Sequence, residues 1–185
     1  MKIESTAIPD VKRLTPKRWG DERGYFVEVF NSLEMNNAGI KFSAVQENQS
    51  LSFATGTVRG LHFQVPPYAQ AKIVRVLRGK IFDVAVDIRF GSPSYGQFIA
   101  EELSAENGVQ LFIPRGFAHG FCTLEIDTEI SYLIDNPYAP ECDRVIAWND
   151  QDISIVWPEG AGSVLSAKDS EAPKLRDVEV SFNYS

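Results

Sequence analysis

The sequence predicts an all-β fold, because short apolar runs alternate with turn-forming residues along most of the chain. Glycine, proline and asparagine supply those turns, as at Gly91-Ser92-Pro93 and Asn107-Gly108. The runs between the turns have the length of strands and are rich in β-branched and aromatic residues, which favour extended backbone. Many short strands joined by regular turns are typical of a β-sandwich or a β-barrel.

The turns also delimit the individual elements. A short helix is expected at residues 32–38 and a second at residues 167–176, so that the few helices lie mainly near the C-terminus. The weaker periodicity after Trp157 predicts a terminal extension that covers the core. Strands are expected at residues 25–30, 51–53, 58–63, 73–77, 81–88, 98–103, 109–113 and 121–133.

Length and composition predict a single domain over residues 1–185. A chain of this length with 44% hydrophobic residues can bury a substantial core without disulfides. Cys122 and Cys142 have neither a CxxC nor a zinc-binding spacing, which predicts ordinary thiols in a reducing compartment. No stretch approaches the roughly 20 apolar residues that span a bilayer, and the N-terminus has no continuous apolar segment. We therefore expect a cytoplasmic protein without a membrane partner.

The formal net charge of −7 argues against nucleic acid as a partner, because non-specific binding to nucleic acid needs a basic stripe. A single anionic small molecule is compatible with this charge, since salt screens distant acids beyond roughly 10 Å. Several cations lie within or beside the unusual motifs of the chain: Arg23, Arg59, Lys72 and Arg115.

Only two histidines occur, and each lies in a dense glycine-containing motif. His62 belongs to Arg59-Gly60-Leu61-His62-Phe63-Gln64, and His119 follows Pro114-Arg115-Gly116. Histidine titrates near neutral pH and can act as a base, an acid, a hydrogen-bond donor to an anion, or a metal ligand. The other interpretation of either residue is a hydrogen-bonded histidine in the core.

Polar residues also recur at alternate positions of the expected strands. Residues two apart on a strand point to the same face, which pairs His62 with Gln64, Gln46 with Asn48, and Gln70 with Lys72. A closed β-structure would bring these faces together in its interior. A purely structural protein would place apolar residues there, because buried polar groups need partners. The competing interpretation is that some of these faces point to water.

Two motifs resemble those of the cupin superfamily. Pro114-x-Gly116-x-x-His119 resembles the second cupin motif, and Gly56 followed by His62 resembles the start of the first. A metal-binding cupin would continue with a second histidine and a glutamate, whereas this chain has Gln64 and then Gln70 and Lys72. Glutamine is a poor transition-metal ligand, and a lysine ammonium repels a cation. We expect no metal and no other cofactor.

Longer segments together resemble the dTDP-4-dehydrorhamnose 3,5-epimerase family, and they cover nearly the whole chain in the family's order. This resemblance implies a cupin-type jelly roll and a homodimer. It also implies a metal-independent isomerase that inverts C3 and C5 of dTDP-4-keto-6-deoxyglucose in dTDP-L-rhamnose biosynthesis. The matching segments are residues 21–28, 46–50, 57–64, 66–72, 113–121, 148–150 and 157–158.

The resemblance assigns roles to individual residues. It makes His62 the base, Asp169 its carboxylate partner, Tyr132 the proton donor and Lys72 the group that stabilises the oxyanion at O4 of the sugar. Arg59 and His119 are expected near the diphosphate, and Arg23 is expected to come from the partner subunit. Tyr138 and Phe26 could contact the nucleobase or the sugar of the substrate. The full set of expected substrate-binding residues is Arg23, Glu28, Gln46, Glu47, Asn48, Arg59, His119, Asp143 and Lys168.

The sequence departs from the family pattern at two positions: Asp143 stands in place of the usual glutamate, and Val145 in place of a glycine. These departures concern recognition of the nucleotide and leave the proton chemistry intact. Three rival functions remain. The same His, Asp and Tyr constellation could serve an epimerase of one centre or a keto-isomerase on a related nucleotide sugar. The second rival is a non-catalytic sugar-nucleotide sensor, which the intact catalytic residues disfavour, and the third is a metal-dependent cupin oxygenase.

Overall fold

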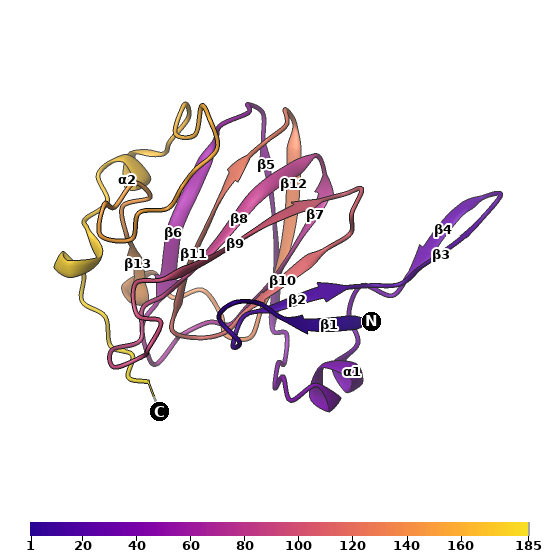
Figure 1. Cartoon of the computed structure of the whole chain (residues 1–185), viewed down its shortest axis with the longest axis horizontal. Coiled ribbons are helices and arrows are strands. Elements are labelled where there is room, and N and C mark those ends of the chain that lie inside the picture. Colours follow the sequence, from indigo (N-terminus) through magenta and orange to yellow (C-terminus); the bar gives the residue numbers. More distant parts are fainter. Residues whose placement is uncertain (185) are drawn as a thin grey trace.

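A computed structural model describes residues 1–184 and contains two antiparallel β-sheets that face each other (Figure 1). The six-stranded sheet has the order β1 (Lys2–Ser5), β2 (Lys12–Thr15), β10 (Gln110–Ile113), β7 (Lys72–Arg78), β12 (Thr128–Ile134), β5 (Gln46–Ser52). The five-stranded sheet has the order β13 (Asp143–Val145), β6 (Val58–Gln64), β11 (Phe117–Thr123), β8 (Lys80–Asp87), β9 (Phe98–Ser104). The prediction of an all-β fold is confirmed.

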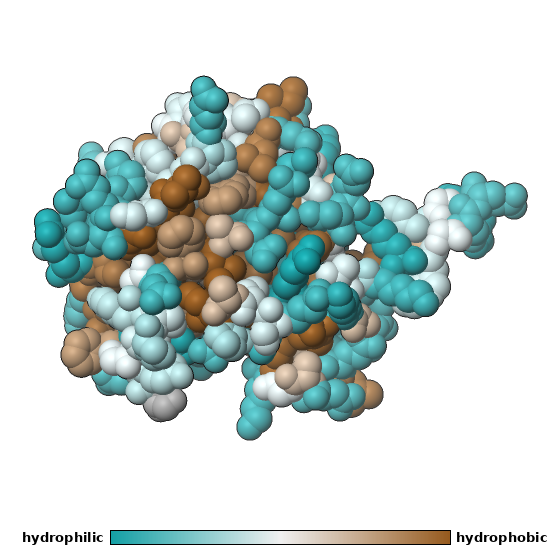
Figure 2. Space-filling model, in the orientation of Figure 1, coloured by the Kyte–Doolittle hydropathy of each residue, from teal (hydrophilic) through white to brown (hydrophobic). Residues whose placement is uncertain are grey.

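A separate two-stranded hairpin, β3 (Arg18–Asp21) and β4 (Gly24–Val27), projects from the body of the molecule (Figure 1). Its tip is hydrophilic in Figure 2. Nearer the body, the rings of Trp19 and Phe26 lie 6.0 Å apart and are largely exposed. A hairpin that exposes aromatic rings on a projecting arm is suited to contact another molecule.

The core fills the space between the two sheets because apolar residues alternate along the strands. On β7 the inward residues include Val74 and Val76, and on β8 they include Ile81 and Ala85. Leu111 of β10 and Phe117 of β11 complete the same cluster. Both faces of this interior are therefore apolar at its centre.

Each sheet is also covered on its outer face. The C-terminal segment lies over the five-stranded sheet, where Trp157, Val180 and Phe182 pack on a second apolar cluster. This confirms the predicted extension that covers the core. Helix α1 (Ser32–Asn37) packs Met35 on the outer face of the six-stranded sheet, and the side chain of Asn31 caps its N-terminus. None of the helices within residues 1–184 has both the length and the apolar character needed to cross a membrane.

The structure corrects two of the predicted elements. Residues 121–133 form the two strands β11 and β12, and their apolar run conceals a turn in which Ile126 is exposed to solvent. The expected helix at residues 167–176 is interrupted at Pro173, which lacks the N–H that a continuing helix would need. Two short helices take its place, α2 (Ala167–Ser170) and the 3-10 helix η2 (Leu175–Asp177).

Several short elements escape prediction altogether. Strands β1, β2, β3 and β13 are only three or four residues long, and most of their residues are polar or charged. Such segments lack the apolar alternation on which prediction depends. A further 3-10 helix, η1 (Pro140–Cys142), precedes β13.

Candidate active site

A polar cavity of about 350 Å³ continues the interior between the sheets, where β5 and β7 begin and β6 and β12 end. This volume lies in the range of small-molecule sites. The expected shared face is confirmed, because all three polar pairs at alternate positions line this cavity. Its lining is Gln46, Asn48, His62, Phe63, Gln64, Gln70, Lys72, Tyr132, Ile134, Tyr138, Asp143 and Lys168.

His62 and Asp169 form a hydrogen-bonded pair at the cavity wall. The distance from Nε2 of His62 to Oδ1 of Asp169 is 2.6 Å. Ser166 caps α2, and its hydroxyl donates to Oδ2 of Asp169 at 2.8 Å. Burial acts to raise the pKa of Asp169, but hydrogen bonds from His62 and Ser166 outweigh it and hold this pKa below its ordinary value. An ionised Asp169 accepts a hydrogen bond from Nε2–H of His62, which leaves the lone pair of His62 on Nδ1.

Lys72 brings an ammonium group into the same cavity. The residue is 8% exposed, and its Nζ donates to the carbonyl oxygen of His62 at 3.4 Å. Burial lowers the pKa of Lys72 to about 8, and the charges of Asp143 and Asp83 oppose this effect. Lys72 therefore loses its proton at a pH not far above neutral, and it lies next to the candidate base.

Tyr132 faces the cavity from β12, opposite Asn48 of β5. Burial raises the pKa of Tyr132 above its ordinary value, with a smaller opposing effect from Arg59. The phenol therefore stays protonated at neutral pH and can donate a proton. His62 on one sheet and Tyr132 on the other thus offer a base and an acid to the same space.

Asp143 connects two further cavity residues. The hydroxyl of Tyr138 donates to Oδ2 of Asp143 at 3.1 Å, and Lys168 forms an ion pair with the same oxygen. The carboxylate raises the pKa of Tyr138. Asp143, which stands where the family has a glutamate, therefore reaches both Tyr138 and Lys168 in this structure.

His119 and Arg59 lie close to the site without lining the cavity. His119 pairs with His62 across β11 and β6, and its Nε2 lies 2.7 Å from Oδ1 of the buried Asp83. Burial lowers the pKa of His119, against the attraction of Asp83. Arg59 is an exposed residue whose guanidinium donates to Ser52 Oγ at 3.2 Å and to the carbonyl oxygen of Leu51 at 3.2 Å.

Three of the expected binding residues lie away from the cavity within this chain. Glu47 points to the outer face of the six-stranded sheet, where it accepts a hydrogen bond from Ser131 Oγ at 2.5 Å. Arg23 lies at the hairpin tip, where it forms an ion pair with Asp21. Glu28 follows the hairpin and accepts a hydrogen bond from Asn31 at 3.0 Å. Arg23 therefore does not line this cavity within the described chain.

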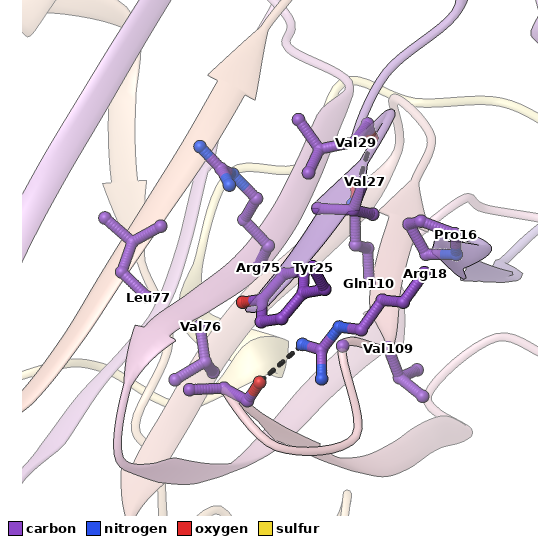
Figure 3. Close-up of a pocket in the computed structure, with 12 residues that line it drawn as sticks. Pro16, Arg18, Tyr25, Val27, Val29, Arg75, Val76, Leu77, Val109 and Gln110 are labelled. Atoms are coloured by element: carbon purple, nitrogen blue, oxygen red, sulfur yellow. Dashed lines mark hydrogen bonds between the residues drawn. The ribbon is translucent and has the colours of Figure 1, made fainter. Parts of the chain in front are cut away.

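A smaller pocket of about 110 Å³ lies at the base of the hairpin (Figure 3). Arg18 crosses it, stacks over the ring of Tyr25 at 4.6 Å and donates to the carbonyl oxygen of Ala105 at 2.5 Å. These contacts fasten the arm to the body. The pocket holds none of the candidate catalytic residues, so we assign it to the attachment of the hairpin.

Gln64 has a structural role at the position of the second cupin histidine. Its Nε2 donates to the carbonyl oxygen of Tyr68 at 2.6 Å, and its Oε1 accepts from the backbone N–H of Ala139 at 2.8 Å. The amide therefore joins two loops at the rim of the cavity. Within the described part of the chain, no group of three His, Cys, Asp or Glu side chains could hold a metal ion.

Sequence reasoning missed two residues beside the site, Asp83 and Ser166. Asp83 interrupts an apolar strand at a position that faces the interior, and that interruption was the signal that could have revealed it. Ser166 precedes a short helix and carries the pattern of a capping residue, three positions before Asp169.

The comparisons with known proteins agree with this geometry. Residues 5–177 match the family model described as dTDP-4-dehydrorhamnose 3,5-epimerase. The chain belongs to the dTDP-4-dehydrorhamnose 3,5-epimerase family. It is therefore an isomerase, a carbohydrate epimerase with the cupin-type jelly roll of this family, and its function lies in dTDP-rhamnose biosynthesis.

Two curated relatives in this family illustrate the likeness. The dTDP-4-dehydrorhamnose 3,5-epimerase of Sinorhizobium fredii is 52% identical over 184 residues, which covers 100% of this chain and 94% of that protein. The enzyme of the same description from Salmonella typhimurium is 49% identical and covers 95% of this chain and 96% of its own length.

Solved structures of the epimerase family superpose closely. The dTDP-6-deoxy-D-glucose-3,5-epimerase of Legionella pneumophila in complex with dTDP-4-keto-L-rhamnose is 41% identical, with a TM-score of 0.94 over 100% of this chain and 98% of that chain. A 3'-monoepimerase from Streptomyces bikiniensis in complex with dTDP-quinovose is 31% identical, with a TM-score of 0.87 over 93% of this chain and 87% of that chain.

Proposed function

We propose that His62, Asp169, Lys72 and Tyr132 carry out the epimerisation of C3 and C5 in dTDP-4-keto-6-deoxyglucose. The observation that carries this proposal is the convergence of a carboxylate-supported histidine, a lysine ammonium and a protonated phenol on one cavity. A ketone at C4 acidifies the hydrogens on both neighbouring carbons, and these groups match the needs of that chemistry.

His62 begins each inversion as the base. Nδ1 of His62 takes the proton from C3 or C5, and the electron pair of the broken C–H bond moves through the carbonyl to O4. Asp169 stabilises the imidazolium that forms, through its hydrogen bond to Nε2. Lys72 donates to the enolate oxygen, where a preorganised donor contributes most when charge develops.

Tyr132 completes the inversion from the opposite side. Its hydroxyl proton adds to the carbon on the face away from His62, the O4 carbonyl re-forms, and the phenolate is left. His62 then releases its proton and Tyr132 regains one by exchange with water, which restores the site for the second carbon. This chemistry needs neither a metal nor another cofactor, and we propose that the enzyme uses none.

Cations and polar residues around the cavity suit a nucleoside diphosphate sugar. Arg59 and His119 are proposed to bind near the diphosphate, for which a guanidinium supplies a fixed fork of donors. Tyr138 is proposed to contact the thymine base. Gln46, Asn48, Asp143 and Lys168 all line the cavity and are proposed to contact the substrate.

We propose that the active enzyme is a homodimer in which the projecting hairpin reaches the partner's cavity. Support comes from the exposed rings of Trp19 and Phe26 and from Arg23 at the hairpin tip. Glu28 would join Arg23 in that contact, because it follows the same arm. Glu47 lies on the outer sheet face beside the root of the arm, where Val29 and Phe30 line the same pocket.

The protein is proposed to act in the cytoplasm, without a nucleic-acid partner. Cys122 and Cys142 are both buried and free, which suits a reducing compartment. The net charge of −7 disfavours binding to a polyanion.

Proton NMR in D₂O tests the proposed reaction directly. Wild-type protein incubated with dTDP-4-keto-6-deoxyglucose is expected to exchange the protons on both C3 and C5, and His62→Ala is expected to exchange neither. Exchange at one carbon alone would identify a single-centre epimerase. Absence of exchange with correctly folded wild-type protein would overturn the assignment and favour a sensor.

A further inference from the structure

Tyr138 reaches the rim of the cavity from residues 135–139, a segment that forms neither a helix nor a strand. The residue is 56% exposed, so packing against the core does not fix the position of its ring. An exposed side chain on an irregular segment is held in place only where its backbone is bonded to the rest of the protein. The bonds to this segment therefore decide where the ring of Tyr138 lies.

Gln64 holds the residues on either side of Tyr138. Its Nε2 donates to the carbonyl oxygen of Pro137 at 3.2 Å, and its Oε1 accepts from the backbone N–H of Ala139 at 2.8 Å. The same Nε2 also donates to the carbonyl oxygen of Tyr68 at 2.6 Å. The opposite orientation of the amide would place its oxygen against two carbonyl oxygens, so these partners determine a single orientation.

The position of Gln64 connects this clamp to the candidate base. Gln64 is the last residue of β6, is 3% exposed, and lies two positions after His62 on the same face of the strand. Its cross-strand partner in β13 is Asp143, which accepts the hydrogen bond from the Tyr138 hydroxyl. The end of β6 therefore fixes both the base and the tyrosine, and with them the separation of the two.

The three backbone groups around Gln64 need a side chain with two donors and one acceptor. A primary amide supplies this set, whereas the neutral imidazole of the second cupin histidine has one donor and one acceptor. An apolar side chain would remove the partner of the Ala139 N–H, and Ala139 is only 5% exposed. The residue type at position 64 thus matches the clamp.

We propose that Gln64 is a positioning residue for nucleotide recognition, which fixes the ring of Tyr138 at the cavity rim at a set separation from His62. Gln64 acts through Tyr138 rather than by contact with the nucleotide. This inference rests on the proposed contact of Tyr138 with the nucleobase. A ring that is ordered before the nucleotide arrives need not be ordered on binding, which favours a higher affinity.

Binding of dTDP to the full-length protein, measured by titration calorimetry, tests this role without turnover. Gln64→Met removes all three hydrogen bonds with an unbranched side chain of similar length. It is expected to weaken dTDP binding by about tenfold, the scale of ordering one side chain on binding. KM for dTDP-4-keto-6-deoxyglucose is expected to rise in parallel with kcat nearly unchanged, because the contact is made equally in the ground state and the transition state.

The double variant Gln64→Met/Tyr138→Ala separates positioning from a general loss of structure. Tyr138→Ala alone is expected to weaken dTDP binding at least as much as Gln64→Met. If Gln64 acts only through Tyr138, the double variant binds dTDP as Tyr138→Ala does, with no further loss.

Thr123→Val is the matched control, because Thr123 clamps a loop at the opposite end of β6. Thr123 is 1% exposed, and its Oγ1 accepts from the backbone N–H of Thr57 at 3.0 Å and donates to the carbonyl oxygen of Ala54 at 2.7 Å. This variant loses the same kind of contact away from the cavity. It is expected to lower Tm and to leave the affinity for dTDP at the wild-type value.

Wild-type affinity for dTDP in folded Gln64→Met overturns the proposal, and so do losses that add in the double variant. If Gln64→Met does not fold, Gln64→Glu keeps the acceptor for Ala139 and loses both donors, and the same weakening and the same absence of a further loss with Tyr138→Ala are expected. Unfolding of both variants would assign Gln64 to the fold alone and would also overturn the proposal.

Wild-type affinity in Tyr138→Ala would overturn the proposal through the contact on which it rests. Binding of dTDP needs no proton transfer, so its outcome is separate from the exchange experiment in D₂O that tests the proposed reaction.

Discussion

His62 and Asp169 are separated by 107 positions in the sequence, and their side chains are joined by a hydrogen bond of 2.6 Å. The histidine belongs to a central strand, whereas the aspartate belongs to a short helix in the C-terminal segment outside the sheets. The candidate base thus comes from the sheet, and its carboxylate partner comes from the C-terminal segment that covers the sheet.

Asp169→Asn is expected to reduce kcat by roughly 10²- to 10⁴-fold, because the amide cannot stabilise an imidazolium on His62. Steady-state kinetics with dTDP-4-keto-6-deoxyglucose measure this effect. Asp152→Asn, which replaces an exposed carboxylate, is the control and is expected to retain wild-type activity. Native kcat in Asp169→Asn would remove the dyad from the mechanism.

Tyr132→Phe is expected to separate proton removal from inversion. His62 remains able to take a proton, so exchange in D₂O continues, whereas the missing hydroxyl slows delivery to the opposite face by roughly 10²- to 10⁴-fold. NMR follows exchange and product formation in the same sample. Tyr68→Phe, at a tyrosine outside the cavity lining, should behave as wild type. Product formation at the wild-type rate in Tyr132→Phe would assign the donor to another group.

Lys72→Met is expected to stabilise the fold at neutral pH while it lowers kcat by roughly 10²- to 10³-fold. The pKa of Lys72 is about 8 in the folded protein and 10.5 ordinarily, so the unfolded chain binds more protons between these values. Burial of the Lys72 charge therefore lowers the free energy of unfolding of the wild type by about 3 kcal/mol, and this loss of stability is present in full below pH 8.

Urea unfolding of Lys72→Met and wild type across pH 6 to 10.5 checks this prediction. The stability advantage of the variant should be largest below pH 8 and should shrink as pH rises toward 10.5, where Lys72 is neutral in the folded protein and about half protonated in the unfolded chain. Lys80→Met, at a partly exposed lysine, serves as the control. A constant advantage across this range would contradict the lowered pKa.

A mixture of Arg23→Ala and His62→Ala proteins is expected to recover activity if the hairpin completes the partner's site. Equal amounts that reassort freely give half heterodimers, each with one intact site, and therefore about a quarter of wild-type activity. Each variant alone should be nearly inactive. Heterodimers that form, as shown by differently tagged subunits, without any recovery would place Arg23 outside a shared site.

Gly60→Ala is expected to destabilise the protein strongly. Gly60 has φ +130°, and an added Cβ would lie 2.4 Å from Cα of Gly120 on the neighbouring strand. We expect Tm to fall by much more than in Gly96→Ala, which has a positive φ of 75° but open space around the new methyl group. The control substitution should lower the free energy of unfolding by about 1 kcal/mol. Equal losses in the two variants would show that the strands at Gly60 and Gly120 move apart to fit the methyl group without a further loss of stability.

Local pattern predicted most of this fold and part of the site. The polar pairs at alternate positions, such as His62 with Gln64, lie together because strand geometry alone determines which side chains share a face. The apolar pattern failed at the turn that contains Ile126, and it failed in short polar strands such as β1 and β2, which have no apolar alternation.

The remaining site residues depend on contacts between distant parts of the chain. Asp169 could be assigned only through the family resemblance, since no local signal connects it to His62. Asp83 was overlooked because one aspartate in an apolar strand resembles a strand end when its partner, His119, is 36 positions away. In both cases the decisive information is tertiary.

The C-terminal covering segment also sets the order in which activity can appear during synthesis. Every strand of the two sheets ends by Val145, so the sheets can pair before Asp169 has left the ribosome. The carboxylate partner of His62 is therefore made only after every strand of the two sheets.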